Sequence, residues 1–109
     1  MDSLHVGLIK GRHLLPVEGY VWTEMVDDPL NFEALELEAQ KWIVDVAQYD
    51  LDNQVVNTMY LYLTGLTSCT VSFLKAWEHV GCFLADNLVL MHWDRDNLTY
   101  LPQPWKVSA

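Results

Sequence analysis

The stretch that most constrains the fold is VVNTMYLYLTGLTSCTVSFLKAWEHVG, residues 55–81, where a strand pattern runs directly into a helix pattern. An apolar run rich in β-branched and aromatic residues ends at Thr64-Gly65, and apolar residues then recur at helical spacing up to Gly81. A second apolar run, NLVLMHW at residues 87–93, follows at once. A strand, a helix and a strand in this order predict a βαβ unit with two parallel strands.

The segments around this unit extend the same pattern. LHVGLIKG, residues 4–11, predicts a first buried strand, and residues 20–22 suit a short extended piece. A first helix is predicted from Asp28-Pro29, because Asp28 can cap it and Pro29 suits its first position. LTYLP, residues 98–102, predicts a last strand that returns as a hairpin after the turn DRDN. Together these elements predict one domain over residues 1–109, a small Rossmann-like α/β fold of order β-α-β-α-β-β with parallel central strands and a C-terminal hairpin.

Charge is unevenly distributed along the chain. The net charge is −9, and residues 18–52 alone hold ten carboxylates against one base, Lys41. Direct DNA or RNA binding is disfavoured, since phosphate contacts need clustered Lys and Arg. No apolar run reaches the length of a membrane span, and Cys69 and Cys82 form no Cys-x-x-Cys pair. We therefore expect a cytoplasmic protein with reduced thiols and no membrane partner.

Polar residues follow the first two predicted strands at the edge where ligands bind in open α/β sheets. The start of a helix attracts anions, Gly65 allows close backbone approach, and hydroxyl groups there can donate hydrogen bonds. Lys10 and Arg12 would supply positive charge from the opposite loop. The predicted phosphate-binding residues are Lys10, Gly11, Thr64, Gly65, Thr67 and Ser68. The alternative is that Thr64-Gly65 only makes the turn into the helix.

The segment YLTGLTSC, together with the predicted strand order, resembles the nucleotide-binding loop of CARF domains, the Rossmann-like sensors of cyclic oligoadenylate in type III CRISPR systems. That loop commonly reads Thr-Gly-Gly-Thr-Lys, and this chain departs from it at Leu66 and Ser68. The resemblance implies a nucleotide second messenger as ligand and a homodimer that holds one ligand across two protomers. The pattern GRH-x-x-PV and the stretch LMHWDRDNLTYLPQ also resemble small proteins of phages and mobile elements.

Some CARF-like proteins cleave their messenger, which gives His13 and Arg12 a catalytic interpretation. In a metal-independent ring nuclease, His13 would transfer a proton and Arg12 would stabilise the phosphorane. The alternative is that His13 ends a strand and bonds a carbonyl group. His79, Cys82 and His92 lack the paired spacing of zinc ligands, so we expect neither a metal nor a cofactor, and the sequence leaves open whether the chain is an enzyme.

The acidic segment supports a second function. Its carboxylates could imitate a nucleic-acid backbone and occupy the basic groove of a CRISPR nuclease, as in a non-enzymatic anti-CRISPR protein. The residues expected to bind are Asp27, Asp28, Glu33, Glu36 and Glu38. The alternative is a solvated face that keeps the domain soluble. Exposed aromatic residues and an edge strand or helix would favour a homodimer under either function.

Overall fold

The structure is a computed structural model that describes residues 3–11 and 15–107 of the chain. Its centre is a five-stranded sheet of order β2-β1-β3-β4-β5. The strands are β1 (Ser3–Ile9), β2 (Gly19–Trp22), β3 (Val56–Tyr62), β4 (Ala85–Asp94) and β5 (Thr99–Lys106). The first four are parallel, and β5 returns antiparallel to β4. The predicted α/β class, with parallel central strands and a C-terminal hairpin, is confirmed.

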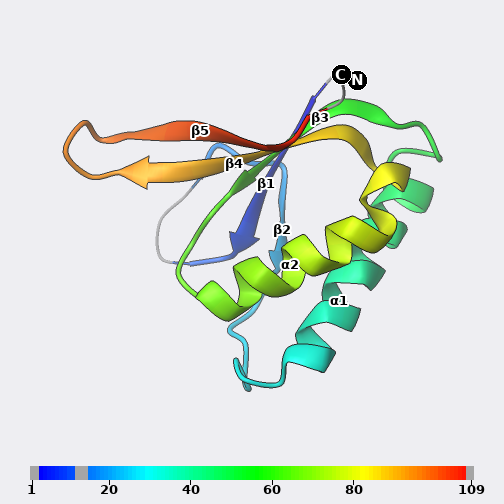
Figure 1. Ribbon diagram of the computed structural model, residues 1–109, viewed down its shortest axis with the longest axis horizontal. Helices are drawn as coiled ribbons and strands as arrows, with labels where there is room; N and C mark the ends of the chain where they lie inside the picture. The colour runs from blue at the N-terminus through cyan, green and yellow to red at the C-terminus, as the bar shows by residue number, and fades with distance from the viewer. Residues whose placement is uncertain (1–2, 12–14, 108–109) are drawn as a thin grey trace.

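Two helices, α1 (Phe32–Asp45) and α2 (Thr67–Val80), lie side by side on one face of this sheet (Figure 1). α1 joins β2 to β3 and α2 joins β3 to β4, so both crossovers run the same way across the sheet and place their helices on the same face. The core lies between the two layers, where Val6 and Leu61 of the strands meet Ile43 and Phe73 of the helices. No helix among the described residues is long and apolar enough to cross a membrane.

α1 begins three residues later than Asp28-Pro29 predicts. The Asp28 carboxylate accepts a hydrogen bond from the Leu30 N–H (3.1 Å), and the Asn31 N–H donates to the Asp28 carbonyl, so these residues form a turn. Asn31 is the capping residue instead, because its side-chain oxygen accepts from the Ala34 N–H (3.3 Å). Asp28 and Asn31 are both suitable capping residues, and the helix begins directly after the second of them.

α2 ends at Gly81, as predicted, but for a different physical reason. Gly81 has a φ of −59°, which any residue can adopt. A Cβ at this position would lie 2.4 Å from the indole ring of Trp77, which is buried in the core. Glycine is therefore required by the close approach of the Trp77 ring and not by a left-handed backbone.

The structure also adds to the predicted strands. Residues 19–22, expected as a short extended piece, form β2 at the edge of the sheet, and α1 follows this strand. The last strand continues past residue 102 to Lys106 and takes in most of the tail. Its hairpin with β4 projects from the body of the molecule (Figure 1).

The sheet face away from the helices carries a row of rings. We define the aromatic row as His5, Tyr60, Tyr62, Trp93 and Tyr100. His5 stacks on Tyr60 at 4.7 Å between ring centroids, and its Nδ1 lies 3.0 Å from the Tyr62 hydroxyl. Burial raises the pKa of the Tyr62 phenol, and the neighbouring Tyr60 raises it further.

Candidate functional sites

The first candidate site is the edge of the sheet where β1 and β3 end, here called the strand-end site. The chain leaves β1 to form β2 on one side and later returns to form β3 on the other. The loops after β1 and β3 therefore diverge at the topological switch point, which is where open α/β sheets bind ligands. The strand-end site comprises Lys10, Gly11, Thr64, Gly65, Thr67 and Ser68.

Thr64 joins the loop after β3 to the end of β1. The Ile9 N–H donates to the Thr64 Oγ1 (3.0 Å), and the Thr64 hydroxyl donates to the Ile9 carbonyl (2.9 Å). The hydroxyl therefore already has both an acceptor and a donor within the fold. Thr64 acts here as a link between strand ends, while the sequence suggested a direct ligand donor.

Gly65 turns the chain into α2. Its φ is +78°, a left-handed backbone conformation that is strained for residues with a side chain. A Cβ at this position would meet no other atom within 4 Å. Leu66 occupies the capping position and has no side chain that can accept a hydrogen bond, so α2 begins at Thr67 without a side-chain cap. Its first turn also lacks an acidic residue. The positive end of the α2 dipole is therefore left without local neutralisation.

The remaining residues predicted for this edge are only partly brought together. Lys10 and Gly11 are exposed just after β1, and the Lys10 N–H donates to the Trp22 carbonyl (2.9 Å). Arg12 and His13 lie outside the described residues, so their predicted catalytic roles stay predictions. The polar end of β4 serves its own hairpin: Asp94 accepts from the Asn97 side chain (2.7 Å), which lowers the pKa of its carboxyl group.

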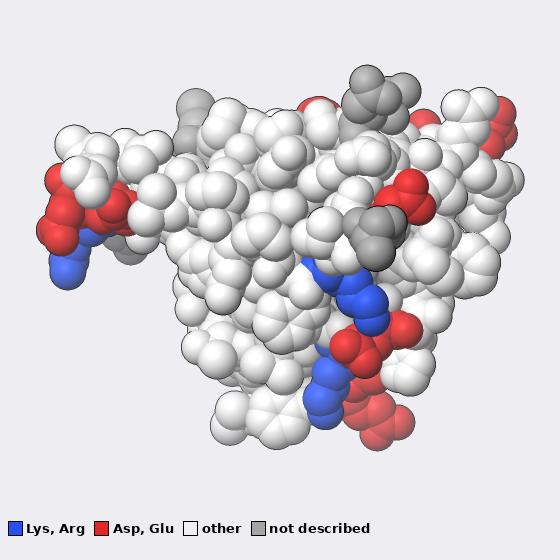
Figure 2. Space-filling view, turned by 45° about the horizontal axis from the view of Figure 1, so that its top comes forward, with Lys and Arg blue, Asp and Glu red and all other residues white. Residues whose placement is uncertain are grey.

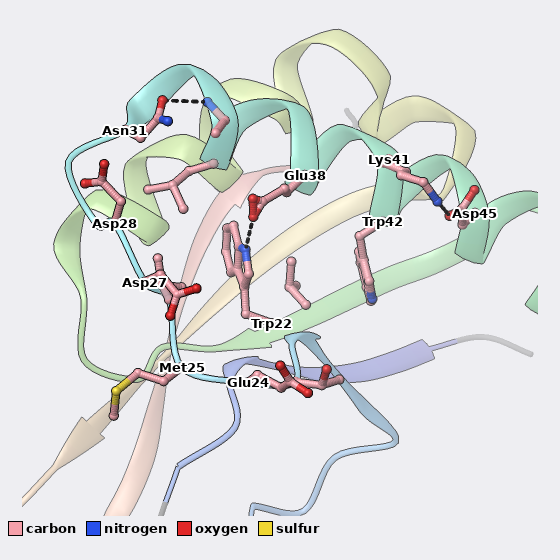
Figure 3. Close-up of a pocket in the computed structure, with 15 residues that line it drawn as sticks. Trp22, Glu24, Met25, Asp27, Asp28, Asn31, Glu38, Lys41, Trp42 and Asp45 are labelled. Carbon is pink, nitrogen blue, oxygen red and sulfur yellow. Dashed lines mark hydrogen bonds and ion pairs between the residues drawn. The ribbon is translucent and has the colours of Figure 1, made fainter.

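The second candidate site is a hollow of about 560 Å³ between α1 and the chain that leads from β2 to it. We name it the acidic cleft. Figure 3 shows α1 forming one wall and the connecting segment 23–31 the other. Its charged and aromatic lining consists of Trp22, Glu24, Asp27, Asp28, Glu38, Lys41, Trp42 and Asp45. The volume lies within the range of small-ligand sites.

Hydrogen bonds fix one wall of the acidic cleft. The Trp22 indole N–H donates to the Glu38 Oε1 (3.4 Å) across the space between β2 and α1 (Figure 3). Trp22 is only 8% exposed, which means that its ring also closes the core beneath the cleft. Farther along α1, the Lys41 ammonium bonds the Asp45 carboxylate (2.5 Å), and this hydrogen bond raises the pKa of Lys41.

The charge balance of the cleft is strongly negative. Five carboxylates line it against a single ammonium group, and that group is already paired with Asp45. Glu24, Asp27 and Asp28 are exposed to solvent along the connecting segment. The cleft therefore offers several carboxylates to a cation that approaches from solvent.

Of the five predicted protein-binding carboxylates, three line the cleft and two do not. Asp27, Asp28 and Glu38 are brought together, whereas Glu36 points to α2 and lies 3.9 Å from His79. Glu33 is exposed in the first turn of α1 and does not line the cleft. Sequence reasoning missed the other five charged and aromatic lining residues, Trp22, Glu24, Lys41, Trp42 and Asp45. The spacing of Glu38, Trp42 and Asp45 along the helix was a usable signal.

No protein-family model, no curated protein and no solved structure matches the chain.

Proposed function

We propose that this protein is a non-enzymatic binding protein whose acidic cleft holds a basic segment of a partner protein. The observation that carries the proposal is the cleft itself, which combines clustered carboxylates with two tryptophan side chains in one hollow. A CRISPR nuclease with a basic nucleic-acid groove, one of the two partner classes expected from the sequence, has the required charge. The chain would then inhibit by occupying that groove.

The lining of the cleft suits an arginine side chain in particular. A guanidinium group binds carboxylates through paired N–H groups and stacks on aromatic faces. Glu38 uses one oxygen for the Trp22 indole, which orients the carboxylate and leaves its other oxygen for a partner. Asp27 and Asp28, on the facing segment, would accept the remaining N–H groups of the same partner segment.

Paired variants of equal charge test this function. The cleft variant carries Asp27→Asn with Glu38→Gln, and the Gln side chain keeps an acceptor for Trp22. The control carries Glu33→Gln with Asp52→Asn, which removes the same charge outside the cleft. Binding to a labelled arginine-rich peptide, and then to a panel of CRISPR nucleases, is measured at two salt concentrations. We expect the cleft variant to lose about tenfold or more in affinity and the control less than about threefold. Equal losses in the two variants would refute the cleft as the binding site.

A second function is favoured by a separate observation, the uncapped start of α2 at the switch point. Helix N-termini bind phosphates through free N–H groups, and a Cβ at Gly65, in the turn before α2, would meet no atom within 4 Å. We propose on this basis that the strand-end site binds a nucleotide such as a cyclic oligoadenylate, with Lys10 contributing charge. Arg12 and His13 would act as catalytic residues if the nucleotide is cleaved without a metal.

Thermal unfolding with a panel of mononucleotides, cyclic dinucleotides and cyclic oligoadenylates tests this second function. A ligand present at about a hundred times its Kd should stabilise the fold by roughly 2.7 kcal/mol. A ligand that raises the midpoint is then incubated with the protein in a chelator and its products are separated. If no nucleotide in the panel raises the unfolding midpoint, the strand-end site is rejected as a nucleotide site.

A further inference from the structure

A second groove runs along the outer side of α2 and is separate from both candidate sites. It has a volume of about 560 Å³ and is lined by Glu36, Val71, Leu74, Lys75, Glu78, His79 and Trp105. We name it the α2 groove. Val71 and Trp105 are each 46% exposed, so the groove presents apolar side chains to solvent. Apolar side chains that are exposed together in a groove are typical of an interface.

Charge favours a second copy of the chain as the occupant of this groove. The chain carries a net charge of −9, so two copies repel each other through most orientations. The α2 groove holds charges of both signs. Glu36 lies 3.9 Å from His79 of the same chain, and Lys75 and Glu78 stand three residues apart on α2, where both are exposed to a partner. A helix with one positive and one negative side chain on a face is complementary to its own antiparallel copy. Figure 2 shows one side of the molecule, where uncharged side chains cover the middle and the charged ones gather in patches.

The edges of the sheet are less suitable for self-association. Pro102 and Pro104 remove two backbone N–H donors from β5, which hinders the addition of another strand at that edge. At the opposite edge, β2 has only four residues. Of the two homodimer contacts expected from the sequence, an edge strand or a helix, the structure therefore favours the helix.

We propose that a second copy of this chain packs its α2 antiparallel into the α2 groove. A two-fold axis between Lys75 and Glu78 then sets Lys75 of each copy beside Glu78 of the other, and such isologous contacts close into a dimer. Val71, Leu74 and Trp105 become covered by the same contact. The acidic clefts are not part of this interface, so the dimer would present two of them.

A charge-swap series measured by sedimentation equilibrium tests this dimer contact. The wild-type chain of 12.6 kDa is expected at twice this mass over a micromolar concentration series. Lys75→Glu sets two pairs of carboxylates against each other and should raise the dimer Kd about tenfold or more. Lys75→Glu with Glu78→Lys restores both pairs and should return the Kd to within about threefold of wild type.

Arg95→Glu is the matched control, because it changes the charge equally at the tip of the β4–β5 hairpin and should leave the Kd unchanged. Circular dichroism confirms that each variant is folded. A wild-type chain that stays monomeric up to about 200 μM would overturn the proposal, since a specific homodimer assembles well below that. A dimer that Lys75→Glu and Arg95→Glu weaken equally would overturn it as well, because the contact would then lie elsewhere.

Discussion

Thr64 is predicted from the sequence to bind a phosphate, and in the structure its hydroxyl also links the ends of β1 and β3. Its substitution by valine tests this structural link. Valine has the shape of threonine but lacks the hydroxyl, so it leaves the N–H and the carbonyl of Ile9 without their partner. A net contribution of about 0.5–1.5 kcal/mol for each bond predicts a loss of about 1–3 kcal/mol in the free energy of unfolding. For a domain of this size the thermal midpoint should fall by roughly 4 °C for each kcal/mol.

Thr64→Ser is the matched control for this prediction. Serine keeps the hydroxyl and both bonds to Ile9 and loses only a methyl group, which should cost less than about 1 kcal/mol. Urea unfolding at 25 °C measures both variants against the wild type, with the slope of the transition checked for constancy. Equal stability of the valine and serine variants would show that the link to Ile9 does not hold the strand ends together. Thr64 would then be free to serve a ligand, as the sequence suggested.

Two further predictions concern residues that the fold constrains by burial. Gly81→Ala should destabilise the protein by about 1–3 kcal/mol through its clash with the Trp77 ring. Gly19→Ala is the control, because a Cβ at Gly19 meets open space. If calorimetry finds both variants equally stable, the clash is contradicted. Burial raises the pKa of Tyr62 above its usual 10, so the fold favours the neutral phenol and this stability is lost as the pH rises past 10. Thermal midpoints measured between pH 8 and 11 should therefore fall more steeply for wild type than for Tyr62→Phe, and parallel curves would refute the assignment.

The parts of the fold that the sequence predicted are those with strong local periodicity. Leu35, Ala39 and Ile43 recur at the spacing of a buried helix face, and all three are buried against the sheet. The alternation of strand and helix patterns along the chain then predicted parallel central strands, because a helix that crosses over the sheet joins two parallel strands. The sequence prediction was weakest where an apolar segment was too short to show a period, as in the four residues of β2.

The candidate sites depend on contacts between segments that are far apart in the chain. The bonds between Thr64 and Ile9 span 55 positions, and no local pattern predicts that a threonine at a Thr-Gly turn will use its hydroxyl on a neighbouring strand. The acidic cleft likewise depends on the path of segment 23–31, which has no periodicity that a sequence could show. Trp22 is buried because β2 packs beneath α1, and this contact is not visible in any local pattern of the sequence.

The two proposed functions require ligands of opposite charge, although both candidate sites lie on the same small domain. The radius of gyration is 13.2 Å, so the carboxylates of segment 18–52 lie within a few Debye lengths of the strand-end site at physiological salt, where that length is about 8 Å. Lowering the salt to 0.01 M extends it to roughly 30 Å, and the whole negative field then reaches a phosphate bound at the strand end. Hydrogen bonds to the start of α2 are local and change little with salt. The attraction between Lys10 and the phosphate also grows as salt is removed, but this single positive charge opposes a net charge of −9, so nucleotide affinity should weaken. A basic segment in the acidic cleft is attracted by the same field and should bind more tightly. The sign of the salt dependence therefore identifies which of the two sites a newly found ligand occupies, before any variant is made.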